Sequence, residues 1–117
     1  MHELALARGI LDAALAHADG RRVRRVEVTV GALRQVVGDS LAFHFEILAR
    51  GTPCEGAQLA QRPQPARLRC ACGEEWELTE PSFRCGRCGG ARVSVIAGEE
   101  LRVEAIEVEE EPCTARR

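Results

Sequence analysis

The chain has 117 residues, of which 45% are hydrophobic and 29% are charged, and its net charge at pH 7 is −2. This length and composition are those of a globular protein with one core, and the slightly acidic balance argues against a surface whose main task is to bind nucleic acid. The apolar stretch at residues 4–18 is interrupted by charges and is too short to span a bilayer, so we expect a cytoplasmic protein without a membrane segment.

The first half of the chain predicts a helix, a strand and a second helix. Apolar residues recur at three- and four-residue spacing over residues 4–19, which is the pattern of an amphipathic helix, and Gly20 suits its C-terminal cap. Residues 26–30 alternate between valine and polar side chains, as a half-buried strand does. A second helix is expected to begin at Asp39 or Ser40, either of which can cap it, and to end near Gly51.

The second half of the chain predicts strands on both sides of a cysteine-rich module. Residues 57–62 are a modest strand candidate, and two prolines then precede the cysteines of residues 67–92. A strand signal begins again at residues 93–95. Residues 101–108 also alternate, but the phase of the alternation slips near Ala105, as a β-bulge would produce.

This order of elements predicts an α+β fold in which two helices cover a small, mainly antiparallel sheet. The cysteine module is expected to be an inserted zinc-ribbon domain at residues 67–92. The main domain is then discontinuous and consists of residues 1–66 and 93–110, while residues 111–117 are expected to form a flexible tail.

Four cysteines form two close pairs, Cys70-x-Cys72 and Cys85-x-x-Cys88, with twelve residues between the pairs. In a reducing compartment such pairs are more often metal ligands than disulfides, and a glycine follows three of the four, which helps a tight turn around a metal. The spacing therefore predicts a tetrahedral zinc site with four cysteine ligands. Because a closed shell leaves no position for a substrate, its role should be structural. Free or disulfide-bonded thiols are the plainer alternative, and iron would accept the same ligands.

The remaining polar side chains give weaker signals. Cys54 and Cys113 stand outside the pairs and are expected to be free thiols. His17 and His44 lie on the predicted helices, where a structural role is commoner than metal binding. The arginines of the cysteine module are nearly balanced by glutamates, which disfavours nucleic-acid binding. Since no Ser-His-Asp set or phosphate-binding loop is present, we do not expect an enzyme.

The chain opens Met1-His2-Glu3, which places an amine, an imidazole and a carboxylate within three residues. Ni(II) and Cu(II) favour planar, nitrogen-rich coordination, in which backbone amide nitrogens can take part. Many proteins begin with such residues by chance, so the motif alone leaves a metal role open beside an incidental start.

Seven stretches together make the chain similar to the HypA family, with its HybF relatives, of nickel metallochaperones in hydrogenase maturation. The resemblance covers residues 1–110 and is far more specific than either metal motif alone. The stretches that carry it are Met1-His2-Glu3-Leu4, Val28-Thr29-Val30-Gly31-Ala32-Leu33, Ser40-Leu41-Ala42-Phe43-His44-Phe45-Glu46, Gly51-Thr52-Pro53-Cys54-Glu55-Gly56-Ala57, Cys72-Gly73-Glu74-Glu75-Trp76, Cys85-Gly86-Arg87-Cys88-Gly89 and Gly98-Glu99-Glu100-Leu101.

The resemblance implies a transferable Ni(II) bound at the N-terminus and a structural Zn(II) in the ribbon. His2 would contribute its ring and its backbone nitrogen, with Met1 and Glu3 in the same site. Nickel would pass, with a GTPase partner, to the large subunit of a [NiFe] hydrogenase, and some relatives also serve urease. The competing interpretation is a zinc-ribbon module that binds protein or nucleic acid and has no nickel role.

One residue pair departs from the family pattern, which has Cys-x-x-Cys at the first knuckle. If Cys72 is the ligand that precedes glycine, the usual first ligand falls at Arg69, which cannot bind zinc. Either Cys70 reaches the metal around a shorter turn or the protein supplies three ligands, and we favour Cys70 as a ligand.

Overall fold

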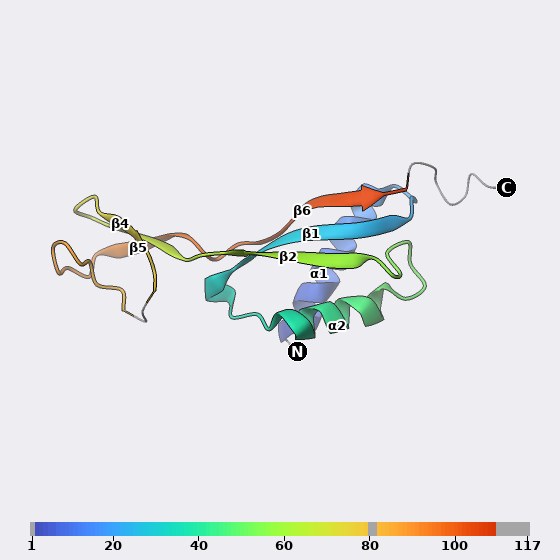
Figure 1. Cartoon of the computed structure of the whole chain (residues 1–117), viewed down its shortest axis with the longest axis horizontal. Coiled ribbons are helices and arrows are strands. Elements are labelled where there is room, and N and C mark those ends of the chain that lie inside the picture. Colours follow the sequence, from blue (N-terminus) through green and yellow to red (C-terminus); the bar gives the residue numbers. More distant parts are fainter. Residues whose placement is uncertain (1, 80–81, 110–117) are drawn as a thin grey trace. The chain divides into compact units, whose positions relative to one another are not determined.

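The computed structural model describes residues 2–79 and 82–109 (Figure 1). The described residues form two compact units, each with its own three-stranded sheet, in the order β2-β1-β6 and β4-β3-β5. In chain order the elements are α1 His2–Ala18, β1 Val23–Gly31, the short 3-10 helix η1 Ala32–Arg34, α2 Gly38–Ala49, β2 Gln58–Gln64, β3 Arg67–Cys70, β4 Glu75–Glu77, β5 Val93–Ala97 and β6 Leu101–Val108. The predicted α+β fold, with two helices and a ribbon that carries the cysteines, is confirmed.

The first unit contains residues 2–29, 36–62 and 102–109 and has its core between the helices and one face of β1. The apolar spacing along α1 and α2 gives each helix one buried face, and the two helices contact each other. Val23, Val26 and Val28 of β1 are buried as well. Their exposed fractions are at most 3%. The core side chains are Ala7, Ile10, Leu11, Ala14, Ala18, Val23, Val26, Val28, Leu41, Phe45 and Ala49.

The opposite face of this sheet carries ion pairs in place of an apolar layer. Glu27 of β1 contacts Arg25 at 3.3 Å and Arg62 at 3.9 Å. The hydroxyl of Thr29 donates a 2.8 Å hydrogen bond to the Glu104 carboxylate of β6, which lowers the pKa of that carboxyl. Because charged side chains occupy this face, the two helices cover only one side of the sheet.

The last strand shows the change of phase that the sequence predicts. Along β6, half-buried and exposed residues alternate up to Val103 and again from Ile106 to Val108. Between them, Glu104 and Ala105 are both exposed, so the apolar residues on either side can share one face.

The start of α2 differs from the expectation that Asp39 or Ser40 caps it. The helix begins at Gly38, with Val37 as its N-cap residue, and no side chain of that residue bonds to the helix. Asp39 instead lies in the first turn and is exposed. A carboxylate from the other helix, that of Glu3, accepts a hydrogen bond from the Val37 backbone N–H at 3.2 Å.

The second unit contains residues 30–35, 63–79 and 82–101, so it is larger than the cysteine-rich module itself. In its antiparallel sheet, β3 lies between β4 and β5, and Leu68 pairs with Trp76 on one side and Val95 on the other. Leu68 is fully buried. β3 and β4 are not predicted from the sequence, because runs of four and three residues are too short to show a period.

Two glycines of the second unit allow the backbone to pass at close range. A Cβ on Gly31 would collide with the backbone carbonyl of Gly98, and a Cβ on Gly98 would lie 2.6 Å from the Cα of Ala66. The same segments are joined by hydrogen bonds from Gly31 N–H to the Glu100 carbonyl at 2.6 Å and from Leu33 N–H to the Gly98 carbonyl at 2.8 Å. Glycine is therefore required at this crossing.

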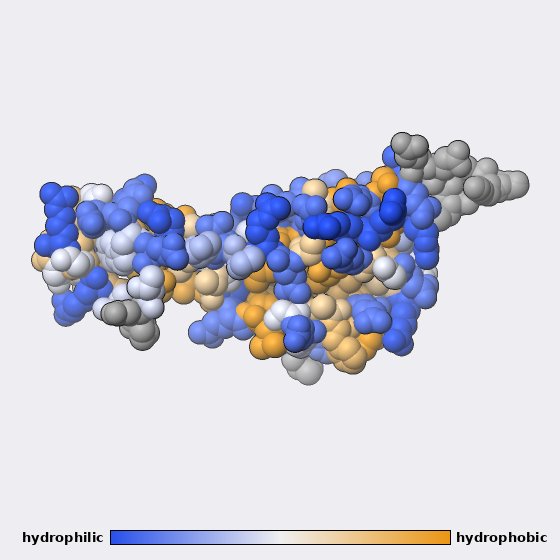
Figure 2. All heavy atoms as spheres, in the orientation of Figure 1, coloured by the Kyte–Doolittle hydropathy of each residue, from blue (hydrophilic) through white to orange (hydrophobic). Residues whose placement is uncertain are grey.

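Hydrophobic side chains also reach the surface of the first unit. Figure 2 shows them gathered over α2 and beside the start of the chain. The two most exposed are Val37 and Phe43, at 60% and 58%, while Leu4 and Ile47 are exposed to 39% each. An exposed apolar group of this kind is common where another protein binds.

Candidate metal centres

All four paired cysteines converge at one point of the second unit. β3 ends at Cys70, the following turn carries Cys72, and a second turn carries Cys85 and Cys88. Hydrogen bonds close both turns: Cys70 N–H donates to the Glu74 carbonyl at 2.8 Å, and Cys85 N–H donates to the Gly90 carbonyl at 2.9 Å. The cluster is therefore held by the sheet on one side and by a tight loop on the other.

The sulfur positions fit a tetrahedral metal ion. Cys70 Sγ lies 3.5 Å from Cys88 Sγ, Cys72 Sγ lies 3.7 Å from Cys85 Sγ, and all four atoms lie within 4.8 Å of one another. Zinc–sulfur bonds of about 2.3 Å at tetrahedral angles place sulfur atoms about 3.8 Å apart. Cys70, which precedes the shorter turn, is inside this cluster, so four sulfurs are available to one zinc ion.

In the second turn, backbone amides donate hydrogen bonds to the two cysteine sulfurs. The N–H groups of Arg87 and Cys88 both point to Cys85 Sγ, at 3.3 and 3.4 Å, and Gly90 N–H points to Cys88 Sγ at 3.3 Å. The hydrogen bond from Cys88 N–H, with that from Arg87 N–H, lowers the pKa of Cys85 to about 7. These amides stabilise thiolates, which are the form that binds zinc.

The first turn is built differently because it is one residue shorter. Cys70 is buried, and although the Cys72 N–H lowers its pKa, burial and the neighbouring thiols raise it to about 11. Gly73 closes the turn by donating to the Cys70 carbonyl at 2.9 Å, with a positive φ of 101°. A metal ion would supply the positive charge that this sulfur needs to lose its proton.

The predicted nickel ligands lie at the start of α1. His2 is the first residue of the helix and is exposed to solvent, while Met1 lies outside the described residues. The carboxylate of Glu3 is held by the Val37 N–H, and this bond keeps the pKa of Glu3 below its ordinary value of 4.5. In the described part of the chain, the four cysteines are the one cluster of three or more metal-binding side chains, so a metal at His2 would need backbone or terminal nitrogen.

The other candidate residues that the structure describes are not part of the cysteine cluster. Cys54 is a fully buried free thiol in the first unit, where burial raises its pKa, and Cys113 lies outside the described residues. His17 lies near the end of α1, with Nδ1 2.9 Å from the carbonyl of Ala13. His44 is half-buried on α2 and packs edge-on against Phe43.

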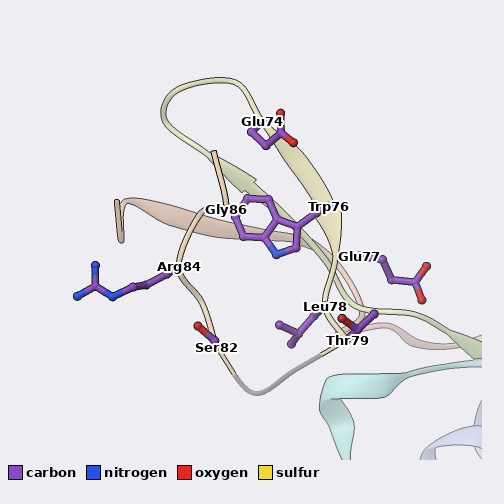
Figure 3. Close-up of a pocket in the computed structure, with 8 residues that line it drawn as sticks. All are labelled: Glu74, Trp76, Glu77, Leu78, Thr79, Ser82, Arg84 and Gly86. Carbon is purple, nitrogen blue, oxygen red and sulfur yellow. The ribbon is translucent and has the colours of Figure 1, made fainter. Parts of the chain in front are cut away.

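The second unit also contains an open cavity of about 390 Å³ that the sequence did not predict. Figure 3 shows the indole of Trp76 extending from β4 toward the segment with Arg84 and Gly86, whereas Glu74 and Glu77 point away. None of the four cysteines is among its lining residues. None of the described helices combines the length and the apolar character needed to cross a membrane.

The family model described as "Hydrogenase/urease nickel incorporation, metallochaperone, hypA" matches residues 1–108. Two similar curated proteins are both named hydrogenase maturation factor HypA. The one from Streptomyces avermitilis is 41% identical, with 94% of this chain and 88% of that protein covered. The one from a Nostoc species is 40% identical, with coverage of 94% and 97%.

A solved structure supports the same fold. The solution structure of the nickel metallochaperone HypA from Helicobacter pylori matches with a TM-score of 0.70 and 21% identity. The match covers 95% of this chain and 100% of that structure.

Proposed function

The chain belongs to the HypA family of nickel metallochaperones for hydrogenase maturation, and from this premise we propose that Met1, His2 and Glu3 form its Ni(II) site. The observation that carries the proposal is the exposed imidazole of His2 at the first position of α1, beside a carboxylate that is already held in place. The imidazole, the terminal amine and nearby amide nitrogens are the donors that Ni(II) prefers.

The position of this site suits a metal that must be given away. An exposed site on the first residues has few ligands fixed in advance, so part of the binding free energy is used to order the terminus. This lowers the affinity and allows another protein to compete for the ion. Glu3 reduces this ordering cost, because its bond to Val37 already fixes the residue next to His2.

The four-cysteine cluster is proposed to hold the second ion permanently, with Cys70, Cys72, Cys85 and Cys88 as ligands. A zinc ion there would join β3 to the loop that carries the second pair and so replace a core that the second unit lacks, since Leu68 is its one large, fully buried side chain among the described residues. Four thiolates fill the zinc coordination shell, which leaves no catalytic position. We therefore propose that the chain is a metal carrier and not an enzyme.

We further propose that the chain acts in the cytoplasm with other maturation proteins. None of the five described cysteines forms a disulfide, which suits a reducing compartment. The partners would be a maturation GTPase and the large subunit of a [NiFe] hydrogenase, with urease maturation proteins as further candidates. Val37, which Glu3 contacts, is the residue before α2, and Phe43 lies on α2. Both are exposed, and we expect a partner to cover them.

A titration of the zinc-loaded, untagged protein with Ni(II) tests the proposal. We expect one Ni(II) to bind per chain, with a visible absorption band of nitrogen-coordinated nickel and no release of zinc. The same titration after acetylation of the terminal amine should show weaker binding. A zinc-loaded protein that ignores Ni(II) would disprove the carrier function, and salt-dependent binding to nucleic acid would support the competing ribbon module instead.

A further inference from the structure

The four sulfurs of the cysteine cluster are not equally protected. Cys85 accepts hydrogen bonds from two backbone amides and Cys88 from one, at 3.3–3.4 Å. Cys70 receives the N–H of Cys72 and is buried. Cys72 is exposed, and no amide of the described residues donates to its sulfur, which lies 3.7 Å from Cys85 Sγ and within 4.8 Å of the other two sulfurs.

The two exposed sulfurs, Cys72 and Cys88, differ in one hydrogen bond, and Cys72 lies in the turn that is one residue shorter. In the second pair, the amide two residues beyond the second cysteine, that of Gly90, reaches the Cys88 sulfur. The corresponding amide in the first pair belongs to Glu74. The Glu74 carbonyl accepts Cys70 N–H at 2.8 Å, just as the Gly90 carbonyl accepts Cys85 N–H at 2.9 Å, but the Glu74 N–H makes no hydrogen bond to the Cys72 sulfur. Cys72 therefore lacks the donor that Cys88 has, and we attribute this difference to the first turn being one residue shorter.

This difference has a chemical consequence. An N–H···S hydrogen bond withdraws charge from a thiolate and covers part of its surface, which lowers its reactivity toward electrophiles. Of two zinc-bound thiolates, the one that is exposed and lacks such a bond is therefore the stronger nucleophile. From the geometry of the cluster we infer that Cys72 is the modification site of the ribbon, the sulfur that reacts first with soft electrophiles and with peroxide.

The reactions balance without a further reagent. With a haloacetamide, the Cys72 thiolate forms a sulfur–carbon bond, the carbon–halogen bond breaks, and halide leaves with the electron pair. With hydrogen peroxide, a sulfur–oxygen bond forms, the oxygen–oxygen bond breaks, and hydroxide leaves, so that the sulfur is oxidised to a sulfenic acid. Either product is a much weaker zinc ligand than the thiolate, so modification of this one sulfur should loosen the whole site.

The test uses the zinc-loaded full chain and a limiting amount of iodoacetamide. Mass spectrometry that resolves each cysteine should find Cys72 labelled several-fold faster than Cys88, and Cys70 and Cys85 slowest. A chromogenic zinc chelator in the same sample should report zinc release that rises with Cys72 labelling. If Cys88 is labelled as fast as Cys72, or if zinc is lost before any Cys72 reacts, the inference is wrong.

A matched variant tests the cause. Insertion of one glycine between Ala71 and Cys72 restores the two-residue spacing of the second pair, and we expect Cys72 labelling to slow to the rate of Cys88. Its zinc content, measured first, shows whether the variant folds. An inserted residue that leaves the labelling ratio unchanged in a zinc-loaded variant would refute the hydrogen-bond explanation. Should the variant fail to bind zinc, the comparison of Cys72 with Cys88 in the unaltered chain still decides.

Discussion

The Glu3 carboxylate accepts a hydrogen bond from the backbone N–H of Val37, with 3.2 Å between nitrogen and oxygen. This bond joins the starts of the two helices, because Glu3 lies in the first turn of α1 and Val37 is the N-cap residue of α2. The N–H of an N-cap residue is often satisfied by a glutamate inside the same helix, and here a glutamate from the other helix takes that role. Glu3, the neighbour of His2, therefore already has a structural role before any nickel is bound.

The first prediction concerns the pH dependence of this bond. Because the pKa of Glu3 is lowered from 4.5 in the folded protein, the stabilisation is fully present above that value and is lost as the pH falls through the lowered pKa. The chemical shift of the Val37 amide proton, measured by NMR, should therefore titrate with a midpoint below 4.5. In Glu3→Gln this transition should vanish.

A control for this titration is Glu46→Gln, which removes an exposed carboxylate from α2 and leaves the Glu3 bond intact. Its Val37 amide should titrate as in the unaltered protein. A Val37 shift that still titrates in Glu3→Gln would show that another acid controls the start of α2.

The second prediction separates nickel binding from the fold. His2→Ala removes the exposed imidazole at the start of α1, so Ni(II) affinity measured by isothermal titration calorimetry should fall by at least tenfold, or about 1.4 kcal/mol. Zinc content and helical circular dichroism should be unchanged, since His2 is exposed and is not one of the buried core residues.

His17→Ala is the matched control, because His17 is an exposed histidine at the other end of the same helix. It should keep the nickel affinity of the unaltered chain. Equal losses in both variants would mean that nickel binds to exposed histidines without preference, and full retention in His2→Ala would place the site elsewhere.

The third prediction concerns the terminal amine. Two residues added in front of Met1 move the amine away from His2 and convert the Met1 nitrogen into a peptide amide. We expect weaker Ni(II) binding, measured by competition with a coloured chelator, and no change in zinc content. The same two residues added after Arg117 serve as the control. If the N-terminal extension binds nickel as well as the control, the amine has no part in the site.

The sequence was sufficient for the helices and for the cysteine cluster because their signals are local. The spacing of Ile10, Leu11 and Ala14 reports the buried face of α1, and close cysteine pairs report a metal cluster whatever surrounds them. The contact between Glu3 and Val37 joins residues 34 positions apart, and no local pattern can report it. For the same reason the expectation of a local cap at Asp39 was wrong.

In the second unit, prediction from the sequence failed for a different reason. Its sheet uses strands of four, three and five residues, and their pairing depends on contacts that no periodicity reveals. The unequal protection of Cys72 and Cys88 also needed the structure, since the shorter first turn raised only the question of whether Cys70 reaches the metal. The sulfur of Cys70 is in the cluster, and the missing hydrogen bond is at Cys72.

The fourth prediction uses two spectroscopic signals, Trp76 fluorescence and helical circular dichroism, that arise from different units. Trp76 is the single tryptophan and belongs to the second unit, whereas α1 and α2 belong to the first. Removal of zinc by a strong chelator should change Trp76 fluorescence and leave most of the helical circular dichroism. Cys85→Ser should reproduce this effect, while Cys54→Ser, in the first unit, should leave zinc content unchanged. Zinc removal that melts both helices would contradict the separation.

The last prediction compares two glycines with opposite surroundings. A Cβ at Gly31 would collide with the Gly98 carbonyl, and neither segment can move without loss of the 2.6 Å bond from Gly31 N–H to the Glu100 carbonyl. Gly31→Ala should therefore destabilise the second unit by about 1–3 kcal/mol. Gly9 is exposed on α1 with no atom within 4 Å of an added Cβ, so Gly9→Ala should stabilise the first unit by about 0.5–1 kcal/mol.

Urea denaturation of the zinc-loaded proteins distinguishes the two effects, because Trp76 fluorescence follows the second unit and helical circular dichroism follows the first. Gly31→Ala should lower the midpoint seen by fluorescence, and Gly9→Ala should raise the midpoint seen by circular dichroism. The sign matters more than the size: the same substitution is expected to act in opposite directions because backbone lies against one glycine and solvent against the other. A Gly31→Ala variant as stable as the parent would mean that the two segments do not pass at this distance.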